Sequence, residues 1–154
     1  MKKILFTTII FSNFIFSQNI DFEGFMNFSY SSNLGKIHLE VNNLDKEFLY
    51  INSLSRGIGN NDLGLDRGQL GNTRIVFFTK RGNKILLIQP NTKYVSNSDN
   101  YLENRAVEEA FARSVLFSFE IIEEKNNNYV IDLTPLLIND AHGVAERLRY
   151  SNSG

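Results

Sequence analysis

The residues whose types and spacing could do chemistry gather in one glycine-rich segment, residues 55–71 of a 154-residue chain. Backbone amides of such a segment can cradle a phosphate, and its carboxylate and amide oxygens can bind calcium. The spacing of Gly57, Gly59 and Gly64 fits neither GxGxxG nor a Gly-Lys-Ser/Thr ending, which argues against a nucleotide site. The alternating acidic pattern of a calcium loop is also absent. Calcium therefore stays only chemically possible, with oxygens from Asn60, Asn61, Asp62 and Asp66.

We interpret this segment as an interface loop. Long connections without structure of their own are uncommon in compact domains unless they bind or cover something. Glycine lets a backbone approach another surface closely, and a charged pair can bridge two domains. The alternative is a packed loop in which Asp66 and Arg67 hydrogen-bond the loop to itself or to a neighbour. The expected interface residues are Gly57, Gly59, Gly64, Asp66, Arg67, Gly68 and Gln69.

Elsewhere the sequence offers isolated reactive groups. It contains no cysteine and two histidines, His38 and His142, whereas a zinc site needs three or four ligands. Glu108 and Glu109 fall on the polar face of a predicted helix, where carboxylates are usually solvated. Ser114 has no Gly-x-Ser-x-Gly context. We therefore assign no catalytic or metal-ligating residue and expect no cofactor and no enzymatic activity in this chain alone.

Composition and the amino-terminal residues bound the class of protein. A hydrophobic content of 42% with 21% charged residues is typical of a globular domain, and a net charge of −1 argues against nucleic acid. Lys2-Lys3, the apolar run 4–16 and Ser17 predict a signal peptide over residues 1–18. The run is too short to span a membrane. We expect one exported β-rich domain over residues 19–154, in the periplasm, on the outer surface or outside the cell.

Alternation of apolar and polar residues predicts an α+β fold that is mainly antiparallel β. We expect six or seven strands, at residues 25–30, 36–41, 47–52, 74–80, 84–89, 117–121 and 129–133. Residues 47–52 are apolar on both faces, which favours a more central strand. Asp140 is expected to cap a short carboxy-terminal helix.

One amphipathic helix is expected before the last hairpin. Its apolar stripe recurs at helical spacing, at Val107, Ala110, Phe111, Ser114 and Val115. We expect Phe111 and Val115 to pack on the sheet, over a core that contains Phe117, Phe119 and Ile131. Glu109 and Arg113 are expected to pair on the opposite side of this helix.

Three stretches together carry a family resemblance: residues 57–69 (GIGNNDLGLDRGQ), 106–116 (AVEEAFARSVL) and 132–140 (DLTPLLIND). In order and spacing they resemble the N-terminal, non-catalytic region of large secreted bacterial zinc-dependent, metzincin-like metalloproteases. The hairpin 76–87 fits that region too. The catalytic HExxHxxGxxH motif of that family does not occur in this sequence, so no zinc ligand carries over.

The resemblance implies an accessory, scaffold or prodomain-like role beside a metalloprotease domain that normally follows in the same chain. On this reading the chain either stops before the catalytic domain, which its Ser-Asn-Ser-Gly ending favours, or is a stand-alone homologue of the leading domain. Zinc is expected only in a downstream catalytic domain. The alternative is an independent secreted β-rich binding module, whose 57–71 loop binds a glycan, a peptide or Ca²⁺.

We predict that the exported protein begins at Gln18 or Asn19, because Ser17 is a small residue at the end of the apolar run. Mass spectrometry of protein expressed in a Gram-negative host measures this terminus directly. An intact Met1 on soluble cytoplasmic protein would contradict the signal-peptide assignment.

Overall fold

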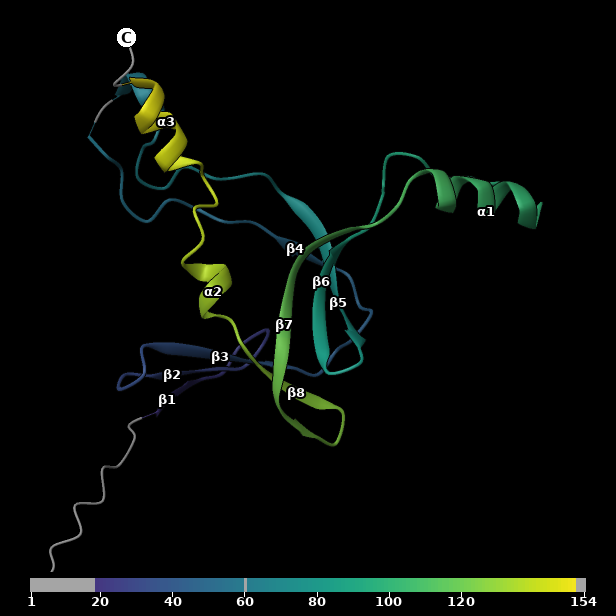
Figure 1. Cartoon of the computed structure of the whole chain (residues 1–154), viewed down its shortest axis with the longest axis horizontal. Coiled ribbons are helices and arrows are strands. Elements are labelled where there is room, and N and C mark those ends of the chain that lie inside the picture. The colour runs from purple at the N-terminus through teal and green to yellow at the C-terminus, as the bar shows by residue number, and fades with distance from the viewer. Residues whose placement is uncertain (1–18, 60, 152–154) are drawn as a thin grey trace, which may run out of the picture.

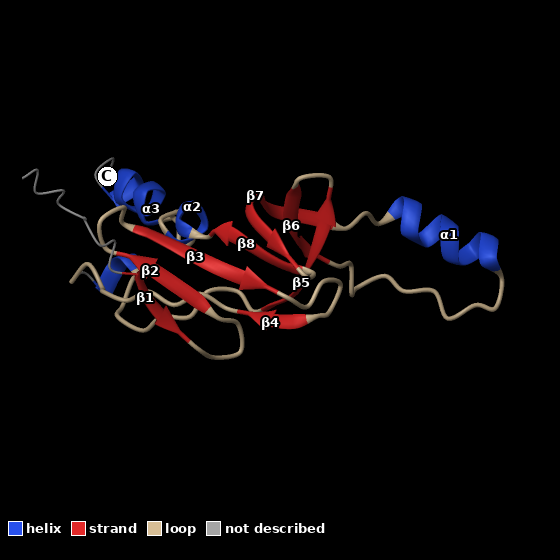
Figure 2. Ribbon diagram, turned by 90° about the horizontal axis from the view of Figure 1, so that it is seen from below, coloured by secondary structure: helices blue, strands red, loops and turns tan. Residues whose placement is uncertain are grey.

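The computed structural model describes residues 19–59 and 61–151, so the expected signal peptide lies outside the described residues. Within them the fold is α+β and mainly antiparallel β, as predicted, with eight strands (Figures 1 and 2). The strands are β1 (Asn19–Phe22), β2 (Phe28–Ser31), β3 (Lys36–Val41), β4 (Phe48–Tyr50), β5 (Arg74–Arg81), β6 (Lys84–Gln89), β7 (Ser114–Lys125) and β8 (Asn128–Asp132). The helices are η1 (Asn61–Leu63), α1 (Tyr101–Ala110), α2 (Thr134–Leu137) and α3 (Val144–Ser151). The additional strand is β1, directly after the expected cleavage point.

The strand order β1-β2-β3-β8-β7-β6-β5-β4 places β3 and β4 five positions apart, although they are consecutive in the chain. In a flat sheet five spacings would need about 24 Å. Residues 42–47 would have to be fully extended to cover that distance. They are not extended, because residues 44–45 form a turn and Asp45 has a φ of +57°. The sheet must therefore curl, and Figure 1 shows β1–β3 running across the direction of β5–β7.

The inner face of the curled sheet holds the core. Its buried side chains come from β3, β5, β6, β7 and β8 and are Leu39, Val41, Val76, Phe78, Ile85, Leu87, Phe119, Tyr129 and Ile131. Phe25, in the β1–β2 connection, contacts Phe48 of β4 with ring centroids 5.9 Å apart. Phe48 in turn lies 5.5 Å from Phe78. The two outer ends of the sheet thus meet over one core.

The predicted amphipathic helix is displaced in the structure. Helix α1 ends at Ala110, and Ser114 and Val115 belong to β7. Val115, Phe117, Phe119 and Ile121 also alternate at a period of two, and β pairing with β6 decides between the two periods. The end of the predicted stripe was therefore the beginning of a strand.

The expected burial of the helix stripe is also wrong. Phe111 is 39% exposed, Val115 is 57% exposed, and α1 has no buried residue. Phe119 and Ile131 are buried, as predicted. Glu109 pairs with Arg105 (2.7 Å) and not with Arg113, whose guanidinium lies 5.8 Å from the centre of the Phe77 ring.

Two further expectations concern single elements. The segment expected to be a central strand is β4, which lies at the edge of the sheet and leaves Leu49 71% exposed. Its apolar inner residues pack on the core, whereas Leu49 belongs to the outer face.

Asp140 does cap the last helix: its carboxylate accepts hydrogen bonds from the amides of Val144 (2.8 Å) and Ala145 (2.9 Å). Across the described ranges, none of the helices is both long and apolar enough to cross a bilayer.

We predict that Phe119→Ala lowers the free energy of unfolding by about 3–5 kcal/mol, because it opens a cavity in the core. Phe111→Ala is the matched control. It should cost about 1 kcal/mol, since Phe111 is half exposed and loses mainly its stacking on Tyr94. Urea unfolding of both variants measures the difference. Equal costs would contradict the placement of α1 away from the core.

Candidate functional site

The glycine-rich segment is a closed loop in the structure. Backbone hydrogen bonds join its two ends: Gly68 N to Leu54 O (2.7 Å), Leu54 N to Gln69 O (2.9 Å) and Gly71 N to Asn52 O (2.8 Å). A loop whose ends are this close and whose interior packs on itself is an Ω-loop. The base of the loop is therefore closed by the chain's own backbone.

Inside the loop, two segments cross at Gly57. A Cβ atom added there would lie 2.9 Å from the Arg67 amide nitrogen and 3.0 Å from the Leu65 carbonyl oxygen. Ile58 N donates to Leu65 O (3.3 Å), and the Leu65 side chain is only 1% exposed. Leu65 thus anchors the loop, and the absence of a side chain at residue 57 permits the crossing.

The expected interface residues divide into two groups. Asp66, Arg67 and Gly68 are exposed on a tight turn, in which Gln69 N donates to Asp66 O (3.1 Å) and Gly68 has a φ of +83°. The positive φ is the reason for glycine at this position of the turn. Gly59 is exposed as well, whereas Gly64 and Gln69 are half-buried, as parts of the loop interior.

The alternative, in which the Asp66 and Arg67 side chains bind the loop to itself, concerns a pair whose side chains form no salt bridge within the described residues. Within the described residues the salt bridges involve other side chains, and both Asp66 and Arg67 remain exposed. Only the backbone of Asp66 contributes to the turn. The exposed surface of the loop also carries apolar side chains, with Ile58 38% and Leu70 63% exposed.

Helix α3 holds the loop from outside. The Arg147 guanidinium donates hydrogen bonds to the carbonyl oxygens of Leu63 (3.1 Å) and Gly64 (3.2 Å), and Figure 1 shows α3 beside η1. Hydrogen bonds from the amides of Ala145 and Val144 hold the pKa of Asp140 below its usual value. The same hydrogen bonds start α3 in the position from which Arg147 reaches the loop.

The two histidines lie on separate elements of the described structure. The described part of the chain contains no group of three or more His, Cys, Asp or Glu side chains that could hold a metal ion. His38 lies on β3, and His142 lies between α2 and α3 with a buried Nε2 atom that has no hydrogen-bond partner. Asn60, one of the possible calcium ligands, lies outside the described residues.

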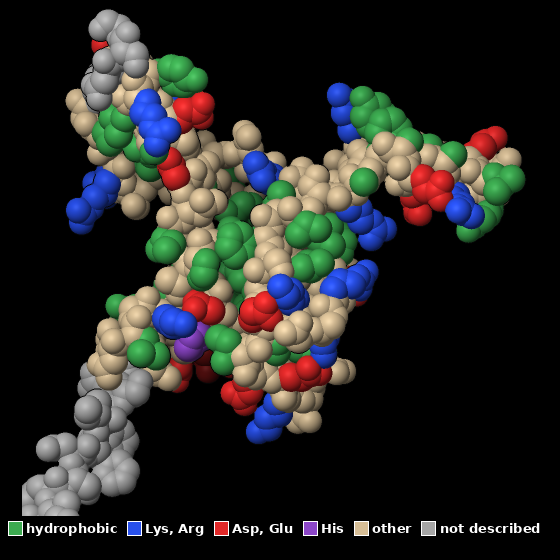
Figure 3. Space-filling view, viewed as in Figure 1, with side chains coloured by type: hydrophobic (Ala, Val, Ile, Leu, Met, Phe, Trp, Pro, Cys, Tyr) green, Lys and Arg blue, Asp and Glu red, His purple; other side chains and the backbone are tan. Residues whose placement is uncertain are grey.

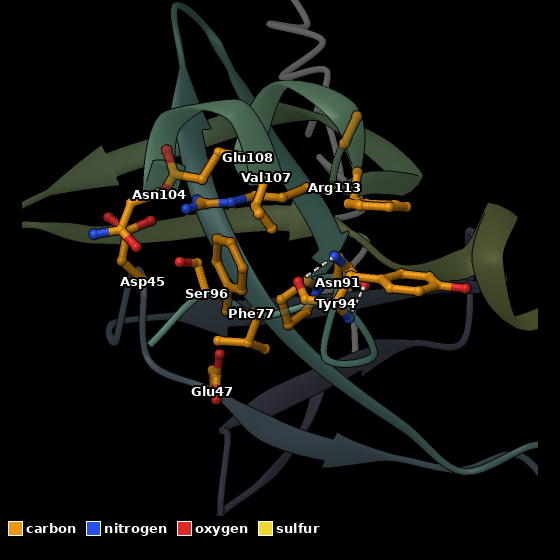
Figure 4. A pocket seen from close by; sticks show the side chains of 14 residues that line it. Asp45, Glu47, Phe77, Asn91, Tyr94, Ser96, Asn104, Val107, Glu108 and Arg113 are labelled. Atoms are coloured by element: carbon orange, nitrogen blue, oxygen red, sulfur yellow. Dashed lines mark hydrogen bonds between the residues drawn. The ribbon is translucent and has the colours of Figure 1, made fainter. Parts of the chain in front are cut away.

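A second candidate surface is a cleft of about 920 Å³ between α1 and the sheet (Figure 4). It was not found from the sequence, because the helix was expected to lie against the sheet. One sequence signal could have placed the start of the helix: Asn100 and Glu103 have the spacing of a capping box, which marks a helix N-terminus. In the structure, Asn100 accepts a hydrogen bond from Leu102 N (3.0 Å) and starts α1 there.

A protein-family model described as Domain of unknown function (DUF5117) matches residues 68–154, more than half of the chain. The chain belongs to the DUF5117 family. No curated protein and no solved structure matches it. The DUF5117 match includes β5 to α3 and begins at Gly68, inside the closed loop. Strand β3, which pairs with β8 of the matched region, lies before it, so the folded unit extends beyond the DUF5117 match.

We predict that Gly57→Ala destabilises this DUF5117 protein by about 1–3 kcal/mol, because the added methyl group meets backbone atoms that cannot move aside cheaply. Gly24→Ala is the control. There the nearest atom to the new Cβ lies 3.9 Å away, and we expect a change within about 0.5 kcal/mol. Thermal unfolding compares the two variants. Equal stability of both would contradict the close crossing at Gly57.

Proposed function

We propose that this chain is a non-catalytic accessory domain that packs on a zinc-dependent metalloprotease domain, normally in the same polypeptide. The resemblance of residues 57–69, 106–116 and 132–140 supports this role. In this proposal the 55–71 loop is the contact surface, and zinc belongs to the catalytic domain.

The contact between α3 and the loop carries the proposal. Helix α3 is the last described element and is hydrogen-bonded to the loop through Arg147. A catalytic domain that followed α3 in the chain would therefore be joined on the side of the molecule where the loop lies. Short connections between neighbouring domains make contacts between nearby surfaces effectively intramolecular, which raises their effective concentration.

The form of the loop also suits a contact surface. Its base is closed by backbone hydrogen bonds and its interior is filled by Leu65, so little conformational entropy is lost when a partner binds. Its outer surface combines the apolar side chains of Ile58 and Leu70 with the exposed charges of Asp66 and Arg67. Apolar area flanked by charged groups is common to interfaces between domains.

Hydrogen exchange tests the proposal on two proteins: this chain alone, and the chain extended by the metalloprotease domain. We expect amides of residues 58–68 to exchange more slowly in the extended protein, because the loop becomes covered. Asp66→Ala should reduce this added protection without changing the melting temperature of the chain alone.

Asp21→Ala is the matched control, since Asp21 is also exposed but lies on β1. It should leave the added protection unchanged. Identical exchange of the loop in the two proteins would contradict the proposal and favour the independent binding module.

A further inference from the structure

Helix α1 turns one face toward the sheet, and none of its residues is buried. Asn104, Val107, Glu108 and Phe111 follow one another at i, i+3, i+4 and i+7, so they share one side of the helix turn. All four line the cleft of about 920 Å³, and none is buried. In Figure 3 the segment that contains α1 stands clear of the body, with hydrophobic side chains along it.

The projecting segment, residues 91–111, has a pair of stacked aromatic rings at its base. Phe111 stacks on Tyr94 with ring centroids 4.1 Å apart and an angle of 15° between the planes. The side chain of Asn91 fixes the outgoing backbone: it donates to Tyr94 O (2.9 Å) and accepts from Lys93 N (3.1 Å). These contacts join the outgoing and returning ends of the segment to each other, and Arg113, which follows the segment, lies over the Phe77 ring of the sheet (5.8 Å).

The opposite wall of the cleft belongs to the sheet. Phe77 of β5 lies on it, and Asp45 and Glu47 extend from the β3–β4 connection (Figure 4). Asp45 is fixed there because its amide donates to Phe78 O (2.7 Å). With Glu108 on the helix, carboxylates lie on both walls of a cleft that also contains aromatic and aliphatic side chains.

Within the described residues, no salt bridge involves Asp45, Glu47 or Glu108. Arg113 lies over the ring of Phe77 (5.8 Å) and Lys93 over the ring of Tyr94 (5.3 Å). The salt bridges found among the described residues use Asp132, Glu124, Glu120 and Glu109 instead. The cleft thus combines three carboxylates with one guanidinium that already faces a ring.

We propose that the cleft between α1 and the sheet binds a polypeptide segment that carries a lysine or arginine beside apolar side chains. The cation would lie between the carboxylates of the two walls, and the apolar side chains would cover Phe77, Val107 and Phe111. Ser96 and Asn104 also line the walls. Ser96 Oγ accepts from Ser98 N (3.3 Å) and Asn104 Nδ2 donates to Ser98 O (2.9 Å), which leaves the Ser96 hydroxyl proton and the Asn104 side-chain oxygen for a peptide backbone. This site lies across the molecule from the 55–71 loop and does not depend on the metalloprotease proposal.

Helix energetics support an occupant. An isolated helix of ten residues is marginal in water, and most helices in proteins are stabilised by packing of an apolar face. Helix α1 has its cap, the Arg105–Glu109 pair, a hydrogen bond from the Asn104 side chain to Ser98 O (2.9 Å) and the stack at its base, but none of its residues is buried. A segment that packed against Val107 and Phe111 would supply the missing apolar contact.

Charge argues against helix α1 of a second copy of this chain as the preferred occupant of the cleft. Helix α1 carries Glu103, Glu108 and Glu109 against the single cation Arg105. An acidic helix would therefore enter a cleft whose walls already carry Asp45, Glu47 and Glu108. Like charges at this proximity repel, whereas a basic segment is attracted to both walls.

Three fluorescein-labelled peptides test the proposal by fluorescence anisotropy on the intact chain. They are Gly-Leu-Lys-Phe-Lys-Leu-Gly, the same peptide with glutamates for lysines, and Gly-Ser-Lys-Ser-Lys-Ser-Gly. We expect saturable binding of the first peptide only, because it alone combines cations with apolar side chains. Its affinity should fall as the salt concentration rises, since screening weakens the attraction. Hydrogen exchange should show added protection at residues 101–111.

Two adjacent glutamates give a matched pair of variants. Glu108→Lys reverses a charge inside the cleft and should weaken binding about tenfold, whereas Glu109→Lys makes the same change on the same helix outside the cleft and should stay within about twofold. The double variant Asp45→Asn/Glu47→Gln removes charge from the other wall and should also weaken binding, without altering α1. Circular dichroism of each variant checks the fold.

The proposal is overturned by any of three results. The first is no saturable binding of the basic apolar peptide, or equal binding of its acidic counterpart. The second is equal weakening by Glu108→Lys and Glu109→Lys. The third is a dimer of the free chain in which residues 101–111 are already protected, because a second copy would then fill the cleft.

Discussion

The pairing of β3 with β8 is the interaction on which the rest of the structure depends. It joins Leu39 to Ile131 and Val41 to Tyr129, all of them core residues, and continues as hydrogen bonds from Leu133 N to Ile37 O (2.8 Å) and from Ile37 N to the Thr134 hydroxyl (2.9 Å). Without this ladder, β1–β3 and β5–β8 would be two separate small sheets. With it, the short 42–47 connection forces β4 over the core and the sheet curls.

The 55–71 loop and helix α1 are attached to this framework in different ways. The 55–71 loop packs on itself and on α3: its ends are joined by backbone hydrogen bonds, Leu65 is buried, and Arg147 of α3 donates hydrogen bonds to it. Helix α1 is held out, on a stacked base, with its inner face open. The DUF5117 match contains all of α1 but cuts through the loop. The cleft is also shared, because Asp45 and Glu47 precede the match while Glu108 lies within it.

Local sequence patterns predicted most strands. They failed where the same residue fitted both the helical spacing and the alternation of a strand. The hairpin of β5 and β6 and the alternation in β3 and β8 were predictable, because each has a turn signal or one buried face. Val115 fits both a helical stripe and an alternating strand, and only pairing with Ile88 decides. The cleft could not be predicted from the sequence for a related reason. A half-apolar helix face predicts contact with a sheet, and nothing local to Val107 or Phe111 says that the sheet stays at a distance.

The β3–β8 ladder also has a kinetic consequence. Its two strands are separated by most of the chain, and contacts between distant residues form slowly because a long loop must close first. During synthesis β3 emerges long before β8, so the inner edge of the amino-terminal meander stays unpaired until the last hairpin appears. Until then Leu39 and Val41 have no β8 side chains to pack against. Cooperative folding of this domain therefore cannot be completed before β8 has been synthesised.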